Sequence, residues 1–243
     1  MIFLERPSWQ LAILSGVLVG ISYLPIKLGF CIYFGFIPIL HSWIINNSKS
    51  NFISGLIFGI IYNLISNYWI GTNSGAEFYV VILSLIFAVF YLSLFWAFFG
   101  YIYGLIKTSR NAYLILPLLI VVLEWVRSFG PLGFTWGNLA LTQSEYPFML
   151  QFLDFTGTYS LTFIIITLNL SIYLYLNGNK FIKENIRLII SILIAIPIFG
   201  FYRMNNILPT SKSIDIAIIQ PNIDPNKKWD YNLRKQTMTF MDS

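Results

Sequence analysis

Long apolar runs separated by short polar segments fill residues 1–203 of this chain. A helix needs about 20 mostly apolar residues to cross the ~30 Å hydrocarbon core of a bilayer. Seven runs meet or approach that length, at residues 9–24, 28–45, 52–70, 78–106, 112–127, 152–176 and 186–202. The pattern predicts an all-α polytopic membrane bundle of about seven transmembrane helices. The fourth run is too long for a perpendicular crossing, so we expect it to tilt or to project beyond the bilayer.

The pattern changes after Tyr202. Residues 214–219 read Ile-Asp-Ile-Ala-Ile-Ile and predict a strand, and residues 231–242 predict a helix. The apolar positions of that helix recur at the i, i+4, i+7, i+8 spacing that packs on a sheet. We therefore expect residues 204–243 to be the start, with one strand and one helix, of a water-soluble α/β domain that is incomplete at Ser243. About 40 residues are too few to bury a core of their own.

Composition supports the membrane assignment. The chain is 57% hydrophobic and only 10% charged, whereas soluble domains are about 25% charged. The formal net charge of +5 does not indicate nucleic-acid binding, because the basic residues lie in loops beside the apolar runs. With the N-terminus in the cytoplasm, that side holds seven Lys and Arg residues and the opposite short loops hold Lys27 and Arg127. The bias predicts a cytoplasmic N-terminus and places the segment after Tyr202 on the periplasmic face of a bacterial inner membrane.

Three pairs of glycines are spaced four residues apart within the apolar runs: Gly16 and Gly20, Gly55 and Gly59, Gly100 and Gly104. Small residues at this spacing let helix backbones approach closely in lipid, where no hydrophobic effect drives helices together. We expect these steps to pack helices within one chain, in preference to forming a dimer.

Ionisable residues inside a membrane helix are costly and therefore informative. Glu124 and Arg127 are three residues apart, hence on one face of a helix, and we expect them to pair with each other. Two roles stay open for the pair: a structural one supporting the loop that follows, or direct contact with a lipid headgroup or substrate. Asp154 is expected to cap a helix start. His41 is the only histidine and Cys31 the only cysteine, which excludes multi-histidine metal sites and His-centred triads within these residues.

The segment 127–143, RSFGPLGFTWGNLALTQ, is unlike an ordinary connector. Its glycines and proline break the helix, yet Leu132, Phe134, Trp136, Leu139 and Leu141 keep it apolar enough to lie in the outer interface or to re-enter it. Such a loop could receive acyl chains. A packed interfacial loop is the alternative that the pattern leaves open.

Motifs along nearly the whole chain match, in order, those of a known protein family. The order of residues resembles the apolipoprotein N-acyltransferases, membrane-anchored bacterial members of the nitrilase superfamily. The resemblance is carried by Tyr23-Leu24-Pro25, Gly55 to Gly59, Tyr68-Trp69, Glu124-Trp125-Val126-Arg127, Gly133-Phe134-Thr135-Trp136-Gly137, Gln151, Gly157-Thr158-Tyr159, Asn169, Ile216 to Asn222 and Lys228-Trp229. The chain departs from the family pattern at Thr135, where proline is usual, and at Ser160, where glycine is usual.

The resemblance implies a ping-pong acyl transfer. A cysteine thiolate of a Glu-Lys-Cys triad would take a fatty acyl group from a phospholipid as a thioester. The α-amine of a diacylglyceryl-modified N-terminal cysteine of an apolipoprotein would then accept it. The membrane helices would hold both lipid substrates, and no metal or organic cofactor is expected. All three triad residues should lie beyond Ser243, so we expect these residues alone to be inactive.

Site residues follow from the same resemblance. Trp229 matches a tryptophan that helps shape the family's active site, and Gln220, Asn222 and Lys228 lie on the same strand end and loop. Phe134, Trp136, Glu124 and Arg127 are the candidates on the membrane side. Two other classes of protein remain as alternatives. A transporter or permease would use Glu124 and Arg127 as a midplane site and should show repeated halves, which the sequence lacks; a lipid-binding scaffold would have no catalytic role.

Overall fold

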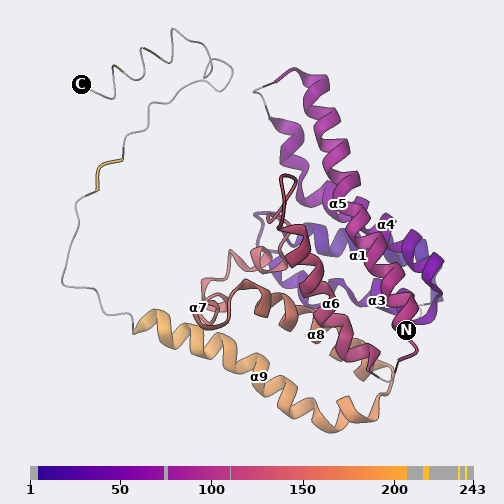
Figure 1. Cartoon of the computed structure of the whole chain (residues 1–243). Coiled ribbons are helices and arrows are strands. Elements are labelled where there is room, and N and C mark those ends of the chain that lie inside the picture. The colour runs from indigo at the N-terminus through magenta and orange to yellow at the C-terminus, as the bar shows by residue number, and fades with distance from the viewer. Residues whose placement is uncertain are drawn as a thin grey trace.

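A computed structural model describes residues 5–73, 76–109, 111–206, 216–218, 235 and 239. The described chain is built from α-helices joined by 3-10 turns, and none of it lies in a β-strand (Figure 1). The elements are α1 Ser8–Ile21, η2 Gly29–Cys31, α2 Ile32–Gly35, α3 Ile37–Ile45, α4 Ser48–Ser66, η3 Tyr68–Thr72, α5 Phe78–Ile106, α6 Ala112–Arg127, η4 Leu139–Gln143, η5 Pro147–Met149, α7 Leu153–Thr156, α8 Thr158–Leu176 and α9 Lys180–Asn205.

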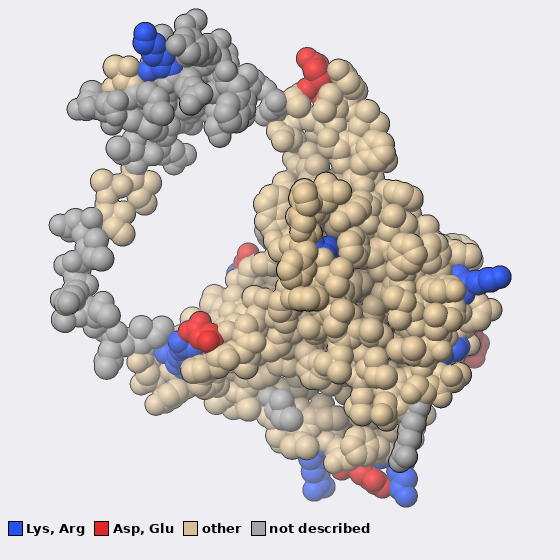
Figure 2. All heavy atoms as spheres, viewed as in Figure 1, with Lys and Arg blue, Asp and Glu red and all other residues tan. Residues whose placement is uncertain are grey.

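Every apolar run predicted from the sequence coincides with helical structure. Among the described helices, α5, α8 and α9 are long and apolar enough to cross a membrane, and α1 and the segment Gly29–Ile45 are shorter apolar helices. The charged side chains visible in Figure 2 lie mainly at the margins of the molecule. The structure thus confirms an apolar helical bundle, while the count of seven crossings stays a prediction.

Some helix boundaries differ from those predicted. The run 152–176 is broken at Gly157, whose φ of 73° is a left-handed conformation that ends α7 and precedes α8. The last helix starts earlier than predicted, at Lys180, because the Asn179 side chain accepts the Ile182 N–H at 3.1 Å and caps it. The predicted strand at 214–219 and helix at 231–242 lie almost wholly outside the described residues.

The second apolar run, residues 28–45, is a helix interrupted at Phe36, and a side chain from α8 bonds to the backbone on both sides of the break. Between α2 and α3, the Phe36 N–H donates to the Asn169 amide oxygen at 3.0 Å, and the Asn169 amide nitrogen donates to the Ile32 carbonyl at 2.8 Å. In a continuous helix the Phe36 N–H would bond directly to the Ile32 carbonyl. The Asn169 side chain, from α8, is therefore inserted into the helix ladder and satisfies both groups.

The glycine steps pack helices within the chain, as predicted. A Cβ added at Gly16 would lie 2.9 Å from the Ile61 Cβ, so α1 sits directly on α4. On the next pair of helices, Cβ atoms added at Gly59 and Gly104 would lie 2.8 Å from the Ser93 Cα and 2.6 Å from the Ser48 Cα. Helices α4 and α5 therefore approach each other at backbone distance.

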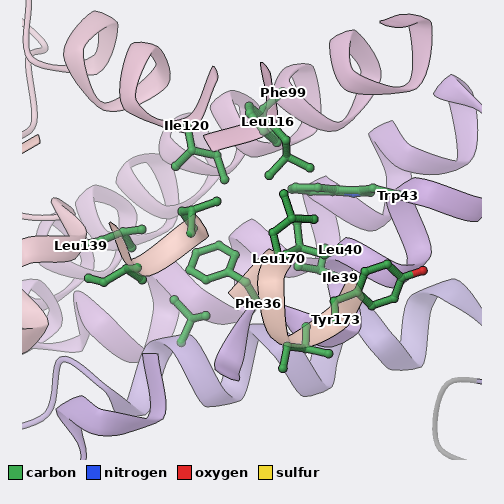
Figure 3. Packing of buried hydrophobic residues seen from close by; sticks show 14 of the residues in the cluster. Phe36, Ile39, Leu40, Trp43, Phe99, Leu116, Ile120, Leu139, Leu170 and Tyr173 are labelled. Atoms are coloured by element: carbon green, nitrogen blue, oxygen red, sulfur yellow. The ribbon is translucent and has the colours of Figure 1, made fainter. Parts of the chain in front are cut away.

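The buried core joins α3 to α5, α6 and α8 (Figure 3). Trp43 on α3 packs against Phe99 on α5, with ring centroids 5.1 Å apart. Leu116 and Ile120 of α6 and Leu170 of α8 belong to the same cluster. This cluster fixes the end of α6, from which the candidate loop departs.

Helix α9 lies at the edge of the molecule and contacts mainly α8 and η5 (Figure 1). The rings of Phe201 and Phe148 stack with centroids 4.4 Å apart. Beside them, Arg203 donates to the Gln151 carbonyl at 2.6 Å and forms an ion pair with Asp154. Asp154 lies in the first turn of α7, at a helix start as predicted, but it makes no capping hydrogen bond, and its carboxylate pairs with Arg203 of α9.

Candidate functional site

The connector that follows α6, residues 128–146, is anchored where it leaves the helix. The Phe134 N–H donates to the Arg127 carbonyl at 2.9 Å, and the Gly133 N–H donates to the Gly130 carbonyl at 3.0 Å. Gly130 has a φ of 80°, which closes this turn. The loop therefore doubles back over the end of α6.

The Glu124 side chain links the connector to two helices of the bundle. One carboxyl oxygen accepts the Leu139 N–H at 2.7 Å, and the other accepts the Thr162 hydroxyl at 2.7 Å. Both carboxyl oxygens act as hydrogen-bond acceptors. One buried side chain, 3% exposed, thus ties together α6, the start of η4 and α8.

Arg127 lies directly beneath Gly137. A Cβ added at Gly137 would be 3.0 Å from Nη2 of Arg127, 3.1 Å from its Nη1 and 3.1 Å from the Tyr62 hydroxyl. A side chain at position 137 would therefore require the Arg127 guanidinium or the Tyr62 hydroxyl to shift. Arg127 is 1% exposed, and its Nε and Nη1 atoms have no hydrogen-bond partner among the described residues.

Two tyrosines bind the same glycine. The Tyr23 hydroxyl donates to the Gly137 carbonyl at 3.1 Å. The Tyr62 hydroxyl lies 3.1 Å from that carbonyl oxygen and 3.0 Å from the Tyr23 hydroxyl. Because each hydroxyl has one proton, Tyr62 can donate to only one of the two at a time.

We call Tyr23, Tyr62, Glu124, Arg127 and Thr162 the polar anchor.

A second set of bonds fixes the far end of the connector. The Gln143 side chain accepts the Tyr33 hydroxyl at 2.9 Å and donates to the Gly29 carbonyl at 3.0 Å. The Tyr146 hydroxyl donates to the Lys27 carbonyl at 2.7 Å. The connector is therefore fixed to the hairpin between α1 and α2 as well as to α6.

The outer side of the connector is apolar and exposed. Leu132 and Trp136 are 69% and 58% exposed. The ring of Trp136 packs edge-on against Trp69 of η3, with centroids 4.6 Å apart, and against Phe134 at 5.7 Å. The loop thus combines a buried polar underside with an aromatic surface, as expected at a membrane interface.

Comparison with known proteins shows which proteins this chain is similar to. Residues 15–171 match the family model described as the apolipoprotein N-acyltransferase N-terminal domain. The chain belongs to the apolipoprotein N-acyltransferase family. It is 29% identical over 251 residues to the apolipoprotein N-acyltransferase of Geobacter metallireducens, covering 98% of this chain and 47% of that protein. It is also 32% identical over 184 residues to the enzyme of that name from Rickettsia typhi, covering 72% of this chain and 36% of the relative.

The chain spans about half the length of the curated relatives it matches. The polar anchor and the connector both lie inside the matched range 15–171. Membership of the apolipoprotein N-acyltransferase family therefore applies to the part of the chain where the site is built. By their names, the relatives support lipoprotein N-acylation as the function of the family.

The structure brings together the membrane-side candidates and corrects one expectation. Phe134 and Trp136 lie together on the exposed side of the connector, and Glu124 and Arg127 lie beneath it. The expected direct ion pair between Glu124 and Arg127 is not formed; the Glu124 carboxyl oxygens accept instead from the Leu139 N–H and the Thr162 hydroxyl. Glu124 and Arg127 are both buried. This agrees with a structural role for the two side chains and disfavours an open transporter site. Trp229, Gln220, Asn222 and Lys228 lie outside the described residues.

Sequence reasoning missed much of the polar anchor. Tyr23 belongs to one of the family motifs, whereas the sequence pattern marks neither Tyr62 nor Thr162. Hydroxyl groups are frequent in apolar helices, where they often bond to their own backbone. No local signal therefore distinguishes a hydroxyl that binds a distant loop.

Proposed function

We propose that this chain forms the membrane portion of an apolipoprotein N-acyltransferase of the bacterial inner membrane. The reaction would transfer a fatty acyl group from a phospholipid to the N-terminal diacylglyceryl-cysteine of apolipoproteins. The observation that carries the proposal is the connector: a rigidly anchored loop with an exposed aromatic face, inside the range that matches the family model. The N-terminus would be cytoplasmic, and residues 204–243 would start a periplasmic nitrilase-like domain.

The chemistry would proceed in two steps. A cysteine thiolate attacks the ester carbonyl of the phospholipid, forming a thioester while the lysophospholipid leaves as the alcohol after taking a proton. The α-amine of the apolipoprotein cysteine then attacks the thioester, forming an amide and releasing the thiol. A Glu-Lys-Cys triad would supply the base, the oxyanion stabilisation and the nucleophile.

Residues 1–243 would not complete this reaction alone. Their single cysteine, Cys31, is buried at the end of η2, and a catalytic thiol must be accessible and activated. The membrane portion would instead position substrates, which lowers the entropic barrier for two lipid molecules that must meet. Phe134 and Trp136 would contact acyl chains, whereas buried Glu124 and Arg127 would hold the loop in place.

On the periplasmic side, Trp229 would help shape the active site, with Gln220, Asn222 and Lys228 around it. This part of the proposal rests on the sequence resemblance alone. It predicts that replacing Trp229 lowers acyl transfer without affecting insertion of the bundle into the membrane.

A chimera tests the proposed function. Residues 1–243 replace the matching half of the Geobacter relative, and cells depleted of their own N-acyltransferase express the chimera. Mass spectrometry of the N-terminal peptide of a lipoprotein then distinguishes diacylated from N-acylated product. We expect N-acylation by the chimera, a clear loss with Trp136→Ala, and little change with Trp9→Ala, an exposed tryptophan on α1.

Residues 1–243 expressed without the second half should give no N-acylated product, and rescue by them would disprove the inactivity proposal. A chimera that inserts into the membrane at normal levels yet produces only diacylated lipoprotein would refute the proposed function.

A further inference from the structure

An apolar groove runs between α5 and α6. Its volume is ≈ 470 Å³, and the side chains that line it are aliphatic or aromatic, among them Phe95, Phe98, Ile102, Leu119, Val122 and Val126. This volume is in the range of sites that hold one small ligand, about 300–1,000 Å³. Among the described residues, no Lys, Arg, Asp or Glu lines the groove, so the groove offers no charged side chain to a headgroup.

The two walls are regular helix faces. The α6 residues recur at Leu119, Val122 and Val126, and Phe95, Phe98 and Ile102 have the corresponding spacing on α5. Such stripes on neighbouring helices ordinarily interdigitate. Here they meet only deeper in the bundle, where Phe99, Leu116 and Ile120 belong to one buried cluster (Figure 3).

The remaining space cannot stay empty without cost. Side chains facing a void lose the dispersion contacts that a filled interior provides. Phe98 and Val122 are 55% and 49% exposed, so the groove opens sideways onto the surface that faces hydrocarbon in a membrane. The material available to fill it is therefore an alkyl chain.

The length of the groove indicates which kind of alkyl chain fits it. Its α5 wall runs from Tyr91 to Ile102, which at 1.5 Å per residue is about 16 Å. That is about half of the ~30 Å hydrocarbon core, the thickness of one leaflet. A single acyl chain of a membrane phospholipid matches this length.

One end of the groove lies next to the connector. Val126 is followed directly by Arg127 of the polar anchor, and the adjacent Trp125 packs edge-on against Phe129 with centroids 4.7 Å apart. Tryptophan and phenylalanine at such a position are typical of the level where chains give way to headgroups. The ester end of a chain in the groove would thus emerge beside the connector.

We propose that the α5–α6 groove is a binding site for one acyl chain of a glycerophospholipid, with its ester end at the connector. That this lipid is the acyl donor rests on the proposed function. The binding itself does not, because it requires only the described helices.

Binding can be measured directly on the 243-residue chain. The protein is reconstituted with a phosphatidylethanolamine that carries a diazirine in one acyl chain, irradiated and mapped by mass spectrometry, with unlabelled lipid as competitor. Native mass spectrometry after extraction into detergent counts the lipids retained. We expect saturable cross-links to residues 91–102 and 119–126 and one retained phospholipid per chain.

Two tryptophan substitutions on α6 provide the matched pair. Val122→Trp fills the groove and should remove contact with about two methylene groups, lowering lipid retention about tenfold. Leu118→Trp introduces the same side chain at an exposed position outside the groove and should leave retention unchanged. Ile102→Trp is a second filling variant from the opposite wall, and circular dichroism confirms that each variant is folded.

Cross-links spread over α5 and α6 in proportion to exposure, without saturation, would overturn the proposal. So would equal lipid retention in folded Val122→Trp and Leu118→Trp. The two proposals fail separately: if the groove binds lipid while the chimera does not acylate, the proposed function fails and the lipid site stands.

Discussion

Replacing Glu124 should release the connector from the bundle. Its carboxyl group accepts two hydrogen bonds of 2.7 Å, from Leu139 and Thr162. Hydrogen bonds to charged groups contribute about 1.5–3 kcal/mol each in soluble proteins, whereas those between membrane helices average about 0.6 kcal/mol. Glu124→Leu also leaves the buried Leu139 N–H without an acceptor. We therefore expect it to cost about 2–4 kcal/mol.

Glu124→Gln should be milder. Its side-chain oxygen can still accept the Leu139 N–H, and its amide can donate to the Thr162 hydroxyl in place of accepting from it. We expect a cost of about 1 kcal/mol. Equilibrium unfolding in mixed micelles measures both variants against the wild type, with Glu145→Leu as a control on an exposed glutamate of the same connector.

Proteolysis reports on the connector itself. If Glu124 anchors it, chymotrypsin should cleave near Phe129 and Trp136 faster in Glu124→Leu, by about thirtyfold for a local cost of about 2 kcal/mol. An unfolding free energy within about 0.5 kcal/mol of the Glu145→Leu control, together with unchanged cleavage, would refute the anchoring role.

Three further substitutions test the packing around the site. Gly59→Leu should lower the unfolding free energy by about 1–3 kcal/mol, because the new side chain meets the backbone of α5. Asn169→Leu leaves the Phe36 N–H without an acceptor and should cost about 1–3 kcal/mol, with faster hydrogen exchange at that amide. Arg203→Asp should separate α9 from α7 and η5, and adding Asp154→Arg should restore the contact. Disulfide formation between cysteines introduced on η5 and α9 measures this contact.

Matched controls separate these effects from general damage. Ile53→Ala alters an exposed position on α4. Asn185→Leu removes a half-buried asparagine of α9 whose amide nitrogen donates to the Phe181 carbonyl of the same helix. Both should be nearly neutral. Equal losses for Gly59→Leu and Ile53→Ala, or for Asn169→Leu and Asn185→Leu, would contradict the assigned contacts. The contact between Arg203 and Asp154 would be contradicted by a double variant that forms the disulfide no better than Arg203→Asp alone.

Much of the fold was predictable from the sequence, whereas the contacts of the site were not. The apolar runs located the helices, because a chain in lipid must satisfy its backbone groups within each segment. The glycine steps predicted intrachain packing correctly. The pairing of Glu124 with Arg127 was wrong, because helical spacing shows which residues share a face but not which distant groups compete for them.

Local composition and the order of motifs are enough to predict an apolar helical protein, the positions of its helices and its family. How the polar residues are used becomes clear only from the folded chain. Thr162 reaches Glu124 across 38 residues, and Asn169 reaches the break at Phe36 across 133. The α5–α6 groove likewise depends on how far two helices stand apart, a distance fixed by the whole bundle. Hydrogen bonds and gaps between segments remote in sequence leave no local pattern, because each partner alone resembles an ordinary residue of its helix.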